Sequence, residues 1–340
     1  MFFVLIKFAV CTGIIFYCGK RVARYGDAIS EKTGLGGLWI GIILVAIATS
    51  LPELFTGIGS TVFIDAPDLT VGNLFGANTY NLVNIAVLDC MNKGVPLLSL
   101  VSTGQLLTAI LSLIPLSVAA VGIFLSRQFP QISFANISLY SIVIFISYLV
   151  SIRIIFGYEK RHRNIVNEMH KEEKNILKHE DIPSKKAYIR YGLFALAIAG
   201  AGIWLAYLGD DLAKYLGLGQ SLVGSLFLGF STTLPEITVS IAALRLGARE
   251  LAVANMVGSN LFNMTIIFLN DVLYRKASIF AALSHQHIFT AFIVILMTVI
   301  ISAALILKPK RKTKFGLSAY AILLFIVFFA GTCINFILGR

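Results

Sequence analysis

Long apolar stretches separated by short polar ones dominate the sequence. A helix needs roughly 20 residues to cross the hydrocarbon core of a bilayer. The first stretch has no basic start and no small-residue cleavage site, so we expect it to remain as a helix and not to be removed as a signal peptide. The pattern predicts an all-α membrane protein with ten transmembrane helices, at residues 2–19, 34–58, 69–90, 104–126, 132–156, 190–208, 217–244, 250–273, 286–307 and 315–338.

Composition agrees with a membrane location. Hydrophobic residues make up 57% of the 340 residues and charged residues 13%, whereas a soluble domain carries about 25% charged residues. This excludes a cytosolic enzyme, a secreted disulfide scaffold and a disordered tail. The net charge of +11 does not indicate nucleic-acid binding, because cytoplasmic loops of membrane proteins are rich in Lys and Arg. The cysteines have no metal-binding spacing and are expected to be free thiols: Cys11, Cys18, Cys90 and Cys333.

The longest polar stretch, residues 157–189, is rich in Lys, Arg and Glu and separates two sets of five predicted spans. We expect residues 1–156 and 190–340 to form two halves joined by this linker. With the N-terminus outside, the inside loops carry 22 Lys and Arg and the outside loops 5. Because cytoplasmic loops carry the excess of positive charge, both termini are predicted outside and the linker cytoplasmic. The short loops favour a prokaryotic plasma membrane.

The two halves contain an internal repeat, at about residues 34–90 and 217–273. Thr49, Leu51, Pro52 and Glu53 recur 183 residues later, and Asn73, Gly76, Asn78, Asn81 and Asp89 recur 182 residues later. Since five helices separate the copies, the repeats have opposite orientations across the membrane. Inverted repeats with interrupted helices are typical of transporters, whose binding site lies near the midplane.

Glu53 and Glu236 fall deep inside predicted spans, while the other fifteen of the 17 acidic residues are placed in loops or at span edges. A carboxylate within the membrane costs roughly 2.5–3.5 kcal/mol on insertion scales, and no basic residue lies nearby in sequence. Each Glu follows a proline, Pro52 or Pro235, which has no N–H and should interrupt its helix. Two such carboxylates facing one site attract a cation.

Neutral oxygens flank both carboxylates in sequence. The interrupted helices free backbone carbonyls, and the neighbouring side chains supply hydroxyls: Thr49, Ser50, Thr232 and Thr233. Two such clusters together offer the about six to eight oxygens that Ca²⁺ prefers, and the same oxygens suit Na⁺. We assign Asn81 and Asn263, deep in their spans, to the ion site. Asn73 and Asn255 are expected to form hydrogen bonds between helices.

Residues 49–53 and 232–236 resemble the two signature motifs of the sodium/calcium exchanger family. The segments 72–78 and 258–263 resemble the second half of each motif. With ten predicted spans and a central linker, the resemblance covers the whole chain. It implies an antiporter that exchanges Ca²⁺ against Na⁺, sometimes with K⁺, and in some branches of the family against H⁺.

The resemblance also implies a set of cation ligands, with Glu53 and Glu236 as the central Ca²⁺ ligands. The remaining positions that match the family pattern are Thr49, Thr232, Ser50, Thr233, Asn81, Asn263, Ser259 and the backbone carbonyls of Ala46 and Gly229. Ala77 departs from the pattern, because the first repeat usually has Ser there. This departure leaves coupling to Na⁺, K⁺ or H⁺ open.

The predicted function is therefore secondary active exchange of Ca²⁺ for Na⁺ by alternating access, with proton- or potassium-coupled exchange as the alternative. A passive cation channel would use the same carboxylates, but the inverted repeat argues against it, and a purely structural role leaves the two buried carboxylates unexplained. An intramembrane enzyme is disfavoured, since His285 and His287 are expected at the membrane interface without ligands around them.

We expect no cofactor other than the transported ions. The partners are these ions and the lipid bilayer, not nucleic acid. A single copy of the chain suffices for transport, and the sequence leaves its oligomeric state open. The first and sixth spans lie outside the repeat and are expected to slide past the core.

Overall fold

The computed structural model describes residues 1–32, 45–126, 128, 133–134, 136–161, 183–313 and 316–338. Within these residues, eight helices are long and apolar enough to cross a membrane. The start of the second predicted span, residues 34–44, lies outside the described residues, and so does most of the predicted linker, residues 162–182.

The first half consists of helices and one short hairpin. Its elements are α1 (Phe2–Lys32), α3 (Leu51–Ile58), the π-helix η1 (Gly59–Phe63), α4 (Pro67–Met91), the 3₁₀ helix η2 (Leu97–Ser99), α5 (Thr103–Leu125), β1 (Ser133–Phe134), β2 (Ile137–Ser138) and α6 (Leu139–Arg161). Residues 45–49, just before α3, are also helical.

The second half is helical throughout its described part. Its elements are α8 (Ser184–Leu216), α9 (Gln220–Val223), the π-helix η3 (Gly224–Leu228), α10 (Gly229–Thr232), α11 (Leu234–Arg245), α12 (Arg249–Leu273), α13 (Ile279–Ala282), α14 (Gln286–Leu307) and α15 (Ala319–Leu338). The short elements α9, η3, α10 and α11 follow one another along one interrupted span.

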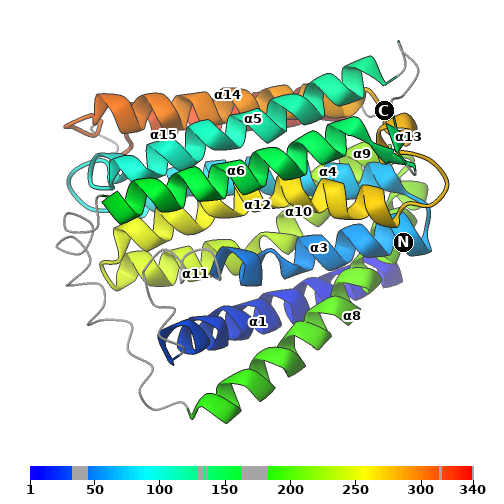
Figure 1. Ribbon diagram of the computed structural model, residues 1–340, viewed down its shortest axis with the longest axis horizontal. Helices are drawn as coiled ribbons and strands as arrows, with labels where there is room; N and C mark the ends of the chain where they lie inside the picture. The colour runs from blue at the N-terminus through cyan, green and yellow to red at the C-terminus, as the bar shows by residue number, and fades with distance from the viewer. Residues whose placement is uncertain are drawn as a thin grey trace.

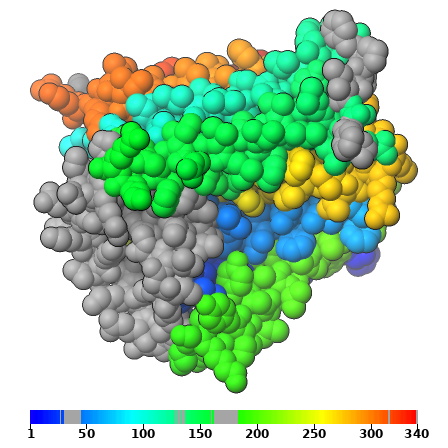
Figure 2. Space-filling model, in the orientation of Figure 1, coloured from blue at the N-terminus to red at the C-terminus, as the bar shows by residue number. Residues whose placement is uncertain are grey.

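The long helices lie side by side, with α4 and α12 in the middle, α1 and α8 along one side, and α14 and α15 along the other (Figure 1). Side chains of α5, α6 and α8 cover much of the face drawn in Figure 2. In the most apolar window of α12, 83% of the residues are buried, against 22% in α15 and 28% in α1. The polar residues of α4 and α12 therefore lie inside the bundle, away from lipid. This position explains why the two central helices carry more polar residues than the outer ones.

Two helices are longer than their apolar stretches. The first was predicted at 2–19 and the sixth at 190–208, whereas α1 continues to Lys32 and α8 runs from Ser184 to Leu216. The two extensions support each other, because α1 and α8 pack together. The Arg190 guanidinium donates a 2.7 Å hydrogen bond to the Tyr25 hydroxyl and stacks over its ring. Contact with a neighbouring helix therefore stabilises turns that hydropathy alone assigns to loops.

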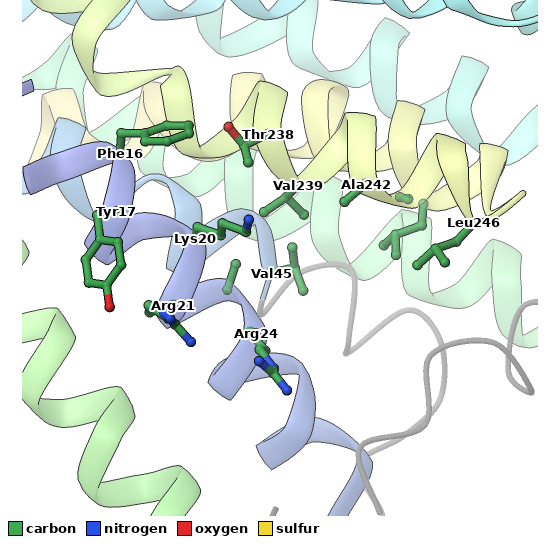
Figure 3. Close-up of a pocket in the computed structure, with 13 residues that line it drawn as sticks. Phe16, Tyr17, Lys20, Arg21, Arg24, Val45, Thr238, Val239, Ala242 and Leu246 are labelled. Carbon is green, nitrogen blue, oxygen red and sulfur yellow. The ribbon is translucent and has the colours of Figure 1, made fainter. Parts of the chain in front are cut away.

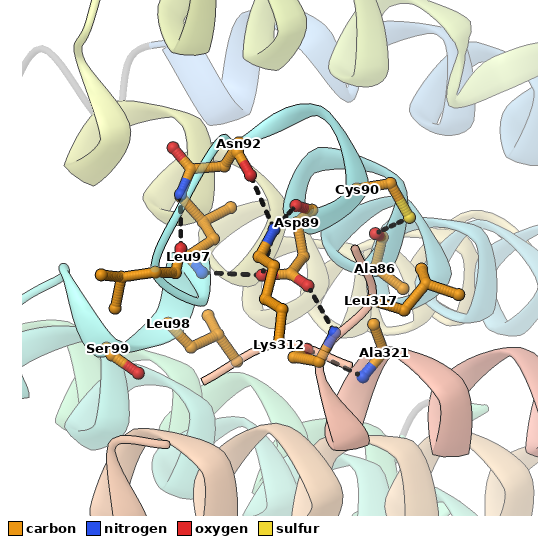
Figure 4. A network of polar contacts seen from close by, with 12 residues as sticks. Ala86, Asp89, Cys90, Asn92, Leu97, Leu98, Ser99, Lys312, Leu317 and Ala321 are labelled. Atoms are coloured by element: carbon orange, nitrogen blue, oxygen red, sulfur yellow. Dashed lines mark hydrogen bonds and ion pairs between the residues drawn. The ribbon is translucent and has the colours of Figure 1, made fainter. Parts of the chain in front are cut away.

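Buried carboxylates at the ends of α4 and α12 connect these helices to their neighbours. The Asp89 carboxylate accepts hydrogen bonds from Leu97 N (2.7 Å) and Ser318 N (3.2 Å), and the Lys312 ammonium lies 3.5 Å away (Figure 4). It also accepts a hydrogen bond from the Tyr320 hydroxyl (2.7 Å). Asp89 thus supplies an acceptor to the backbone that leads into α15, where N–H groups have no helical partner.

Asp271, the repeat partner of Asp89, makes the corresponding contacts at the other end of the bundle. It accepts hydrogen bonds from Ile279 N (2.6 Å), from Ser138 N (2.7 Å) and from the Ser141 hydroxyl, at the start of α6. Ile279 follows Asp271 by eight residues, as Leu97 follows Asp89. The repeat therefore extends from residue type to hydrogen-bond partner.

A second pair of acids lies at the opposite ends of the same helices. Glu250 accepts from Ser102 N (2.8 Å) and Gln105 Nε2 (2.7 Å), at the start of α5. Asp68 accepts from Ser284 N (2.8 Å), at the start of α14, and its carboxylate lies 2.9 Å from His287 Nε2. Each acid thus holds a helix of the other half.

Asp89 and Asp271 lie at helix ends, as expected, and they are also buried, being 0% and 1% exposed. One expectation is corrected: His287, expected at the membrane interface without ligands around it, is 1% exposed and contacts Asp68 and Ser221. Sequence position relative to an apolar stretch does not reveal these roles, because every partner lies on another helix.

We predict that Asp89→Ala destabilises the protein strongly, since it leaves buried donors of Leu97, Ser318 and Tyr320 without an acceptor. Each such loss costs about 1–3 kcal/mol, so the melting temperature in detergent should fall by about 5 °C or more. Asp65→Ala is the control, because Asp65 is a partly exposed loop residue whose carboxylate contacts Lys276. Equal melting temperatures for the two variants would contradict the assignment.

Candidate cation-binding site

Two interrupted helices carry the candidate carboxylates. The helical backbone breaks at Ser50 (φ −87°, ψ 10°) before α3 and at Thr233 (φ −84°, ψ 0°) before α11. In each case the new helix begins Leu-Pro-Glu, with proline in its first turn, where the missing N–H is tolerated. The predicted interruptions are therefore present, with the same local geometry in both repeats.

Both carboxylates are fully buried. Glu53 and Glu236 are 0% exposed and lie in the first turn of α3 and α11, where the helix dipole favours negative charge. The Ser50 hydroxyl donates a 3.2 Å hydrogen bond to Glu236 Oε1, which brings the two repeats into contact. Both oxygens of Glu53 and Oε2 of Glu236 have no hydrogen-bond partner among the described residues.

A cation bound at these two carboxylates would need further ligands, and neutral oxygens are the groups available. Among the described residues there is no group of three or more His, Cys, Asp or Glu side chains able to hold a metal ion. Two carboxylates with surrounding hydroxyl and amide oxygens form a ligand set for a hard cation such as Ca²⁺ or Na⁺.

Threonine and asparagine side chains cross between the repeats. The Thr232 hydroxyl donates to Asn73 Oδ1 (3.0 Å), and the Thr49 hydroxyl donates to Asn255 Oδ1 (3.4 Å). Asn255 Nδ2 in turn donates to the backbone carbonyl of Glu236 (3.2 Å). Asn73 and Asn255 therefore connect α4 and α12 to the interrupted helix of the opposite half, and they position the two threonine hydroxyls.

Asn81 and Asn263 belong to a symmetric group of four asparagines. Asn81 Nδ2 donates to Asn260 Oδ1 (3.0 Å), and Asn263 Nδ2 donates to Asn78 Oδ1 (3.0 Å). The side-chain oxygens of Asn81 and Asn263, their Oδ1 atoms, are buried and have no hydrogen-bond partner among the described residues. The sequence did not assign a role to Asn78 and Asn260. Their position three residues before Asn81 and Asn263, on the same helix face, was the pattern that indicated a shared role. They orient the two amides so that an oxygen of each remains available.

The other candidates differ from one another. Ser259 Oγ is buried without a described partner. The Ala46 carbonyl already accepts from Ser50 N (3.0 Å) and the Thr49 hydroxyl (3.1 Å), and the Gly229 carbonyl accepts from Thr233 N (3.3 Å) and its hydroxyl (2.8 Å). Both lone pairs of each carbonyl oxygen are thus engaged. The residue four positions later, Ser50 or Thr233, still donates its N–H to this carbonyl, because the helix breaks only at that residue.

A second set of buried polar side chains lies beyond Glu53 and was missed from sequence. Thr56 Oγ, Ser60 Oγ and Asn270 Oδ1 have no described partner. The Asn270 amide lies against Gly57, since a Cβ there would be 2.8 Å from Asn270 Nδ2. The repeat-related positions of these three residues are apolar: Val239, Ala243 and Leu88. These three unpartnered polar side chains therefore have no polar counterparts at the repeat-related positions.

Glycines bring α4 very close to the second interrupted helix. A Cβ added at Gly76 would lie 2.3 Å from the Ser225 carbonyl oxygen, and one at Gly229 would lie 2.8 Å from the Gly76 carbonyl carbon. At Gly258, the repeat partner of Gly76, an added Cβ would lie 3.5 Å from the Ala46 side chain among the described residues. Gly76 and Gly229 thus allow α4 and the second interrupted helix to approach closely.

A helical bundle that places two buried carboxylates on paired interrupted helices defines an ion-transporting membrane protein. The sodium/calcium exchanger protein family matches residues 3–155 and 186–333. The chain belongs to this family, whose members are cation exchangers and not enzymes.

Known relatives agree with this assignment. The inner membrane protein YrbG of Escherichia coli (strain K12) is 24% identical over 254 residues, 75% of this chain and 74% of that protein. The sodium/calcium exchanger MaX1 of Methanosarcina acetivorans is 24% identical over 276 residues, 75% of this chain and 79% of that protein. The solved structure of the H⁺/Ca²⁺ exchanger CAX has a TM-score of 0.65 at 14% identity, covering 98% of this chain and 86% of that chain, which shows a shared fold.

We predict that Gly76→Ala destabilises the protein. The added methyl group would overlap the Ser225 backbone, and overpacking of this kind costs about 1–3 kcal/mol. Gly200→Ala on α8 is the control, because an added Cβ there has nothing within 4 Å. Thermal melting in detergent should show a lower melting temperature for Gly76→Ala and little change for Gly200→Ala, and equal melting temperatures would refute the close contact.

Proposed function

We propose that this chain is a secondary active antiporter that exchanges Ca²⁺ for Na⁺ by alternating access, with Glu53 and Glu236 as shared cation ligands. The observation that carries the proposal is the buried carboxylate pair with three oxygens lacking a partner among the described residues. Thr49, Ser50 and Thr232 lie next to the pair. The free amide oxygens of Asn81 and Asn263 and the Ser259 hydroxyl complete the proposed ligand set, with no resident cofactor.

Competition for the two carboxylates accounts for exchange. One Ca²⁺ neutralises the pair, and two monovalent cations do so equally well, but both loads do not fit together. An empty pair with two charges is penalised in a low-dielectric interior, so the protein changes its access state only when loaded. This coupling needs no contact between the two substrates at any time.

The identity of the coupling ion depends on few side chains. The Ser259 hydroxyl favours Na⁺, whereas its repeat partner Ala77 offers no oxygen. MaX1 is named a sodium/calcium exchanger and CAX an H⁺/Ca²⁺ exchanger, so both couplings occur in related proteins. Proton coupling is the alternative for this chain.

The proposed architecture has ten transmembrane helices in two inverted five-helix repeats, with both termini outside and residues 157–189 in the cytoplasm. The 183-residue offset extends beyond the signature motifs, since Gly19 and Gly26 of α1 recur as Gly202 and Gly209 of α8. The two chain ends lie at the same end of the helices, as an even number of spans requires (Figure 1).

The contacts of α1 and α8 support a sliding movement. A Cβ at Gly19 would lie 2.3 Å from the Pro235 ring, whereas one at Gly202 would lie 2.9 Å from Phe55 Cβ. The repeat partner of Pro235 is Pro52, so the contact of Gly202 is displaced by three residues from its symmetric position. Three residues correspond to about 4.5 Å along a helix.

A second pair of contacts is displaced by the same amount. Gly26 faces Ala48, whose side chain would lie 3.7 Å from an added Cβ, and Gly209 faces Leu228 at 2.7 Å. The repeat partner of Leu228 is Val45, again three residues from Ala48. A slide of α1 and α8 by about 4.5 Å past the core would exchange the two environments, which is what alternating access between inverted repeats requires.

The test of function is Ca²⁺ uptake into proteoliposomes loaded with Na⁺, with K⁺ or with a proton gradient. Uptake should follow the outward Na⁺ gradient, and uptake that follows only protons would move the protein to the proton-coupled alternative. Glu53→Gln and Glu236→Gln should each reduce uptake by about 100-fold or more, because the neutral amide no longer balances Ca²⁺.

The matched control is Asp65→Asn, which removes a loop carboxylate. The Lys276 ammonium, 2.5 Å from Asp65, holds the pKa of Asp65 below its usual range, so the wild-type control position is charged throughout the assay. Full uptake by either Glu variant would refute the site, and uptake indifferent to every gradient would indicate a channel.

The sliding of α1 has its own prediction. Gly19→Ala places a methyl group against Pro235 and should reduce exchange by about tenfold or more, since small residues allow close helix contact. Gly13→Ala on the same helix has nothing within 4 Å of the added Cβ and should leave exchange unchanged. Size-exclusion profiles confirm that both variants are folded, and normal exchange by folded Gly19→Ala would contradict the sliding contact.

A further inference from the structure

A cavity of about 490 Å³ separates α1 from α11, away from the carboxylate pair (Figure 3). The wall from α11 consists mainly of apolar side chains, including Val239, Ala242 and Leu246. The wall from α1 carries three cations, Lys20, Arg21 and Arg24, one to two turns beyond Phe16 and Tyr17. A cavity of this size is large enough for an organic ligand.

The three cations of this cavity form no salt bridge with a described carboxylate. The Arg21 guanidinium instead lies over the Tyr17 ring, 5.2 Å from its centroid. Figure 3 shows Lys20, Arg21 and Arg24 along one side of α1, opposite Val239 and Leu246. A positively charged rim beside an apolar wall repels Ca²⁺ and Na⁺, so the cavity is not a suitable ion route. It matches a ligand with an apolar body and an anionic end.

The repeat-related place on α8 lacks these properties. The partners of Lys20, Arg21 and Arg24 are Ile203, Trp204 and Tyr207. There the helices are closed together, because a Cβ at Gly59, the partner of Ala242, would lie 2.9 Å from both Ala206 Cβ and Ile203 Cα. The opening and its charge are therefore specific to α1.

We propose that an anionic phospholipid occupies this cavity, with its phosphate on Lys20, Arg21 and Arg24 and an acyl chain along Val239, Ala242 and Leu246. The side chains of α1 before residue 18 are largely exposed and apolar, so the opening is continuous with the lipid-facing surface. Basic residues at the cytoplasmic end of a membrane helix attract anionic headgroups, and these three residues are on the predicted cytoplasmic side.

One consequence rests on the proposed function. The slide that exchanges the two environments moves Gly19 from Pro235 towards Thr238 and Val239, which line the cavity. A lipid in the cavity occupies the space into which α1 would move. Bound lipid thus favours one access state, and exchange should depend on the fraction of anionic lipid.

The experiment measures lipid binding directly and does not require transport. The full-length protein is equilibrated in vesicles of phosphatidylcholine with phosphatidylglycerol, extracted in mild detergent, and its retained phosphatidylglycerol is counted by native mass spectrometry. Replacing Lys20, Arg21 and Arg24 together by Gln should lower retention by about tenfold or more. Ala242→Trp, which fills the cavity and leaves its charge unchanged, should do the same.

Matched controls are available on α14 and beyond its end. Lys310 and Arg311, changed together to Gln, remove exposed cations from the same predicted face, and Ala303→Trp enlarges an exposed alanine in a membrane helix. Both controls should retain lipid as the wild type does. Wild-type retention in the triple Gln variant or in Ala242→Trp would overturn the proposal, as would equal losses in the controls.

Two further arms separate the sources of failure. Glu53→Gln should retain phosphatidylglycerol as the wild type does, so a failure of the proposed transport function leaves the lipid result intact. Inorganic phosphate added at extraction should not displace the lipid, because the acyl chain contributes to binding. Displacement by inorganic phosphate would overturn the assignment of a lipid in favour of a simple anion site.

Discussion

The burial of two carboxylates without partners is the constraint on which the rest of the structure depends. Glu53 and Glu236 are fully buried, and three of their four oxygens have no described hydrogen-bond donor. In a membrane interior such groups are costly unless a cation or proton joins them. The interrupted helices lower this cost by placing each Glu in a first helical turn, and the crossed Thr–Asn hydrogen bonds fix the surrounding oxygens. These features support the proposed site for an exchanging cation.

The proposed alternating access needs a rigid frame and a movable part, and the polar contacts of the bundle fit this division. Asp68, Asp89, Glu250 and Asp271 hold the starts of α14, α15, α5 and α6 to the ends of α4 and α12. The contacts of α1 and α8 with the interrupted helices are made by glycines and apolar side chains, as where Val22 and Ile198 pack with Ala48. Buried charged hydrogen bonds resist displacement, whereas apolar and glycine surfaces permit sliding. In the proposed cycle, the frame and the movable pair thus differ in chemistry.

The sequence was sufficient to predict the helical class, the family, the helix breaks and the paired carboxylates, because each depends on local pattern or on the repeat. It was not sufficient for the length of α1, since Tyr25 needs Arg190 of another helix to extend it. The burial of His287 was missed for a similar reason. Its repeat partner is a different residue type, Gln105, so the sequence does not reveal that His287 and Gln105 each contact a buried or partly buried acid, Asp68 and Glu250. The coupling ion and the ligand set depend on which oxygens close around an ion, and no local sequence pattern specifies that.

Departures from the repeat carry as much information as the matches. Inverted repeats provide two equivalent states only if the two sides are chemically alike. Here Thr56, Ser60 and Asn270 are polar where their partners Val239, Ala243 and Leu88 are apolar. Unpartnered buried hydroxyls and amides favour hydration, since a water satisfies them at small cost, while apolar side chains do not. In the proposed alternating-access cycle, this asymmetry would give the two access states different free energies, through side chains outside the signature motifs.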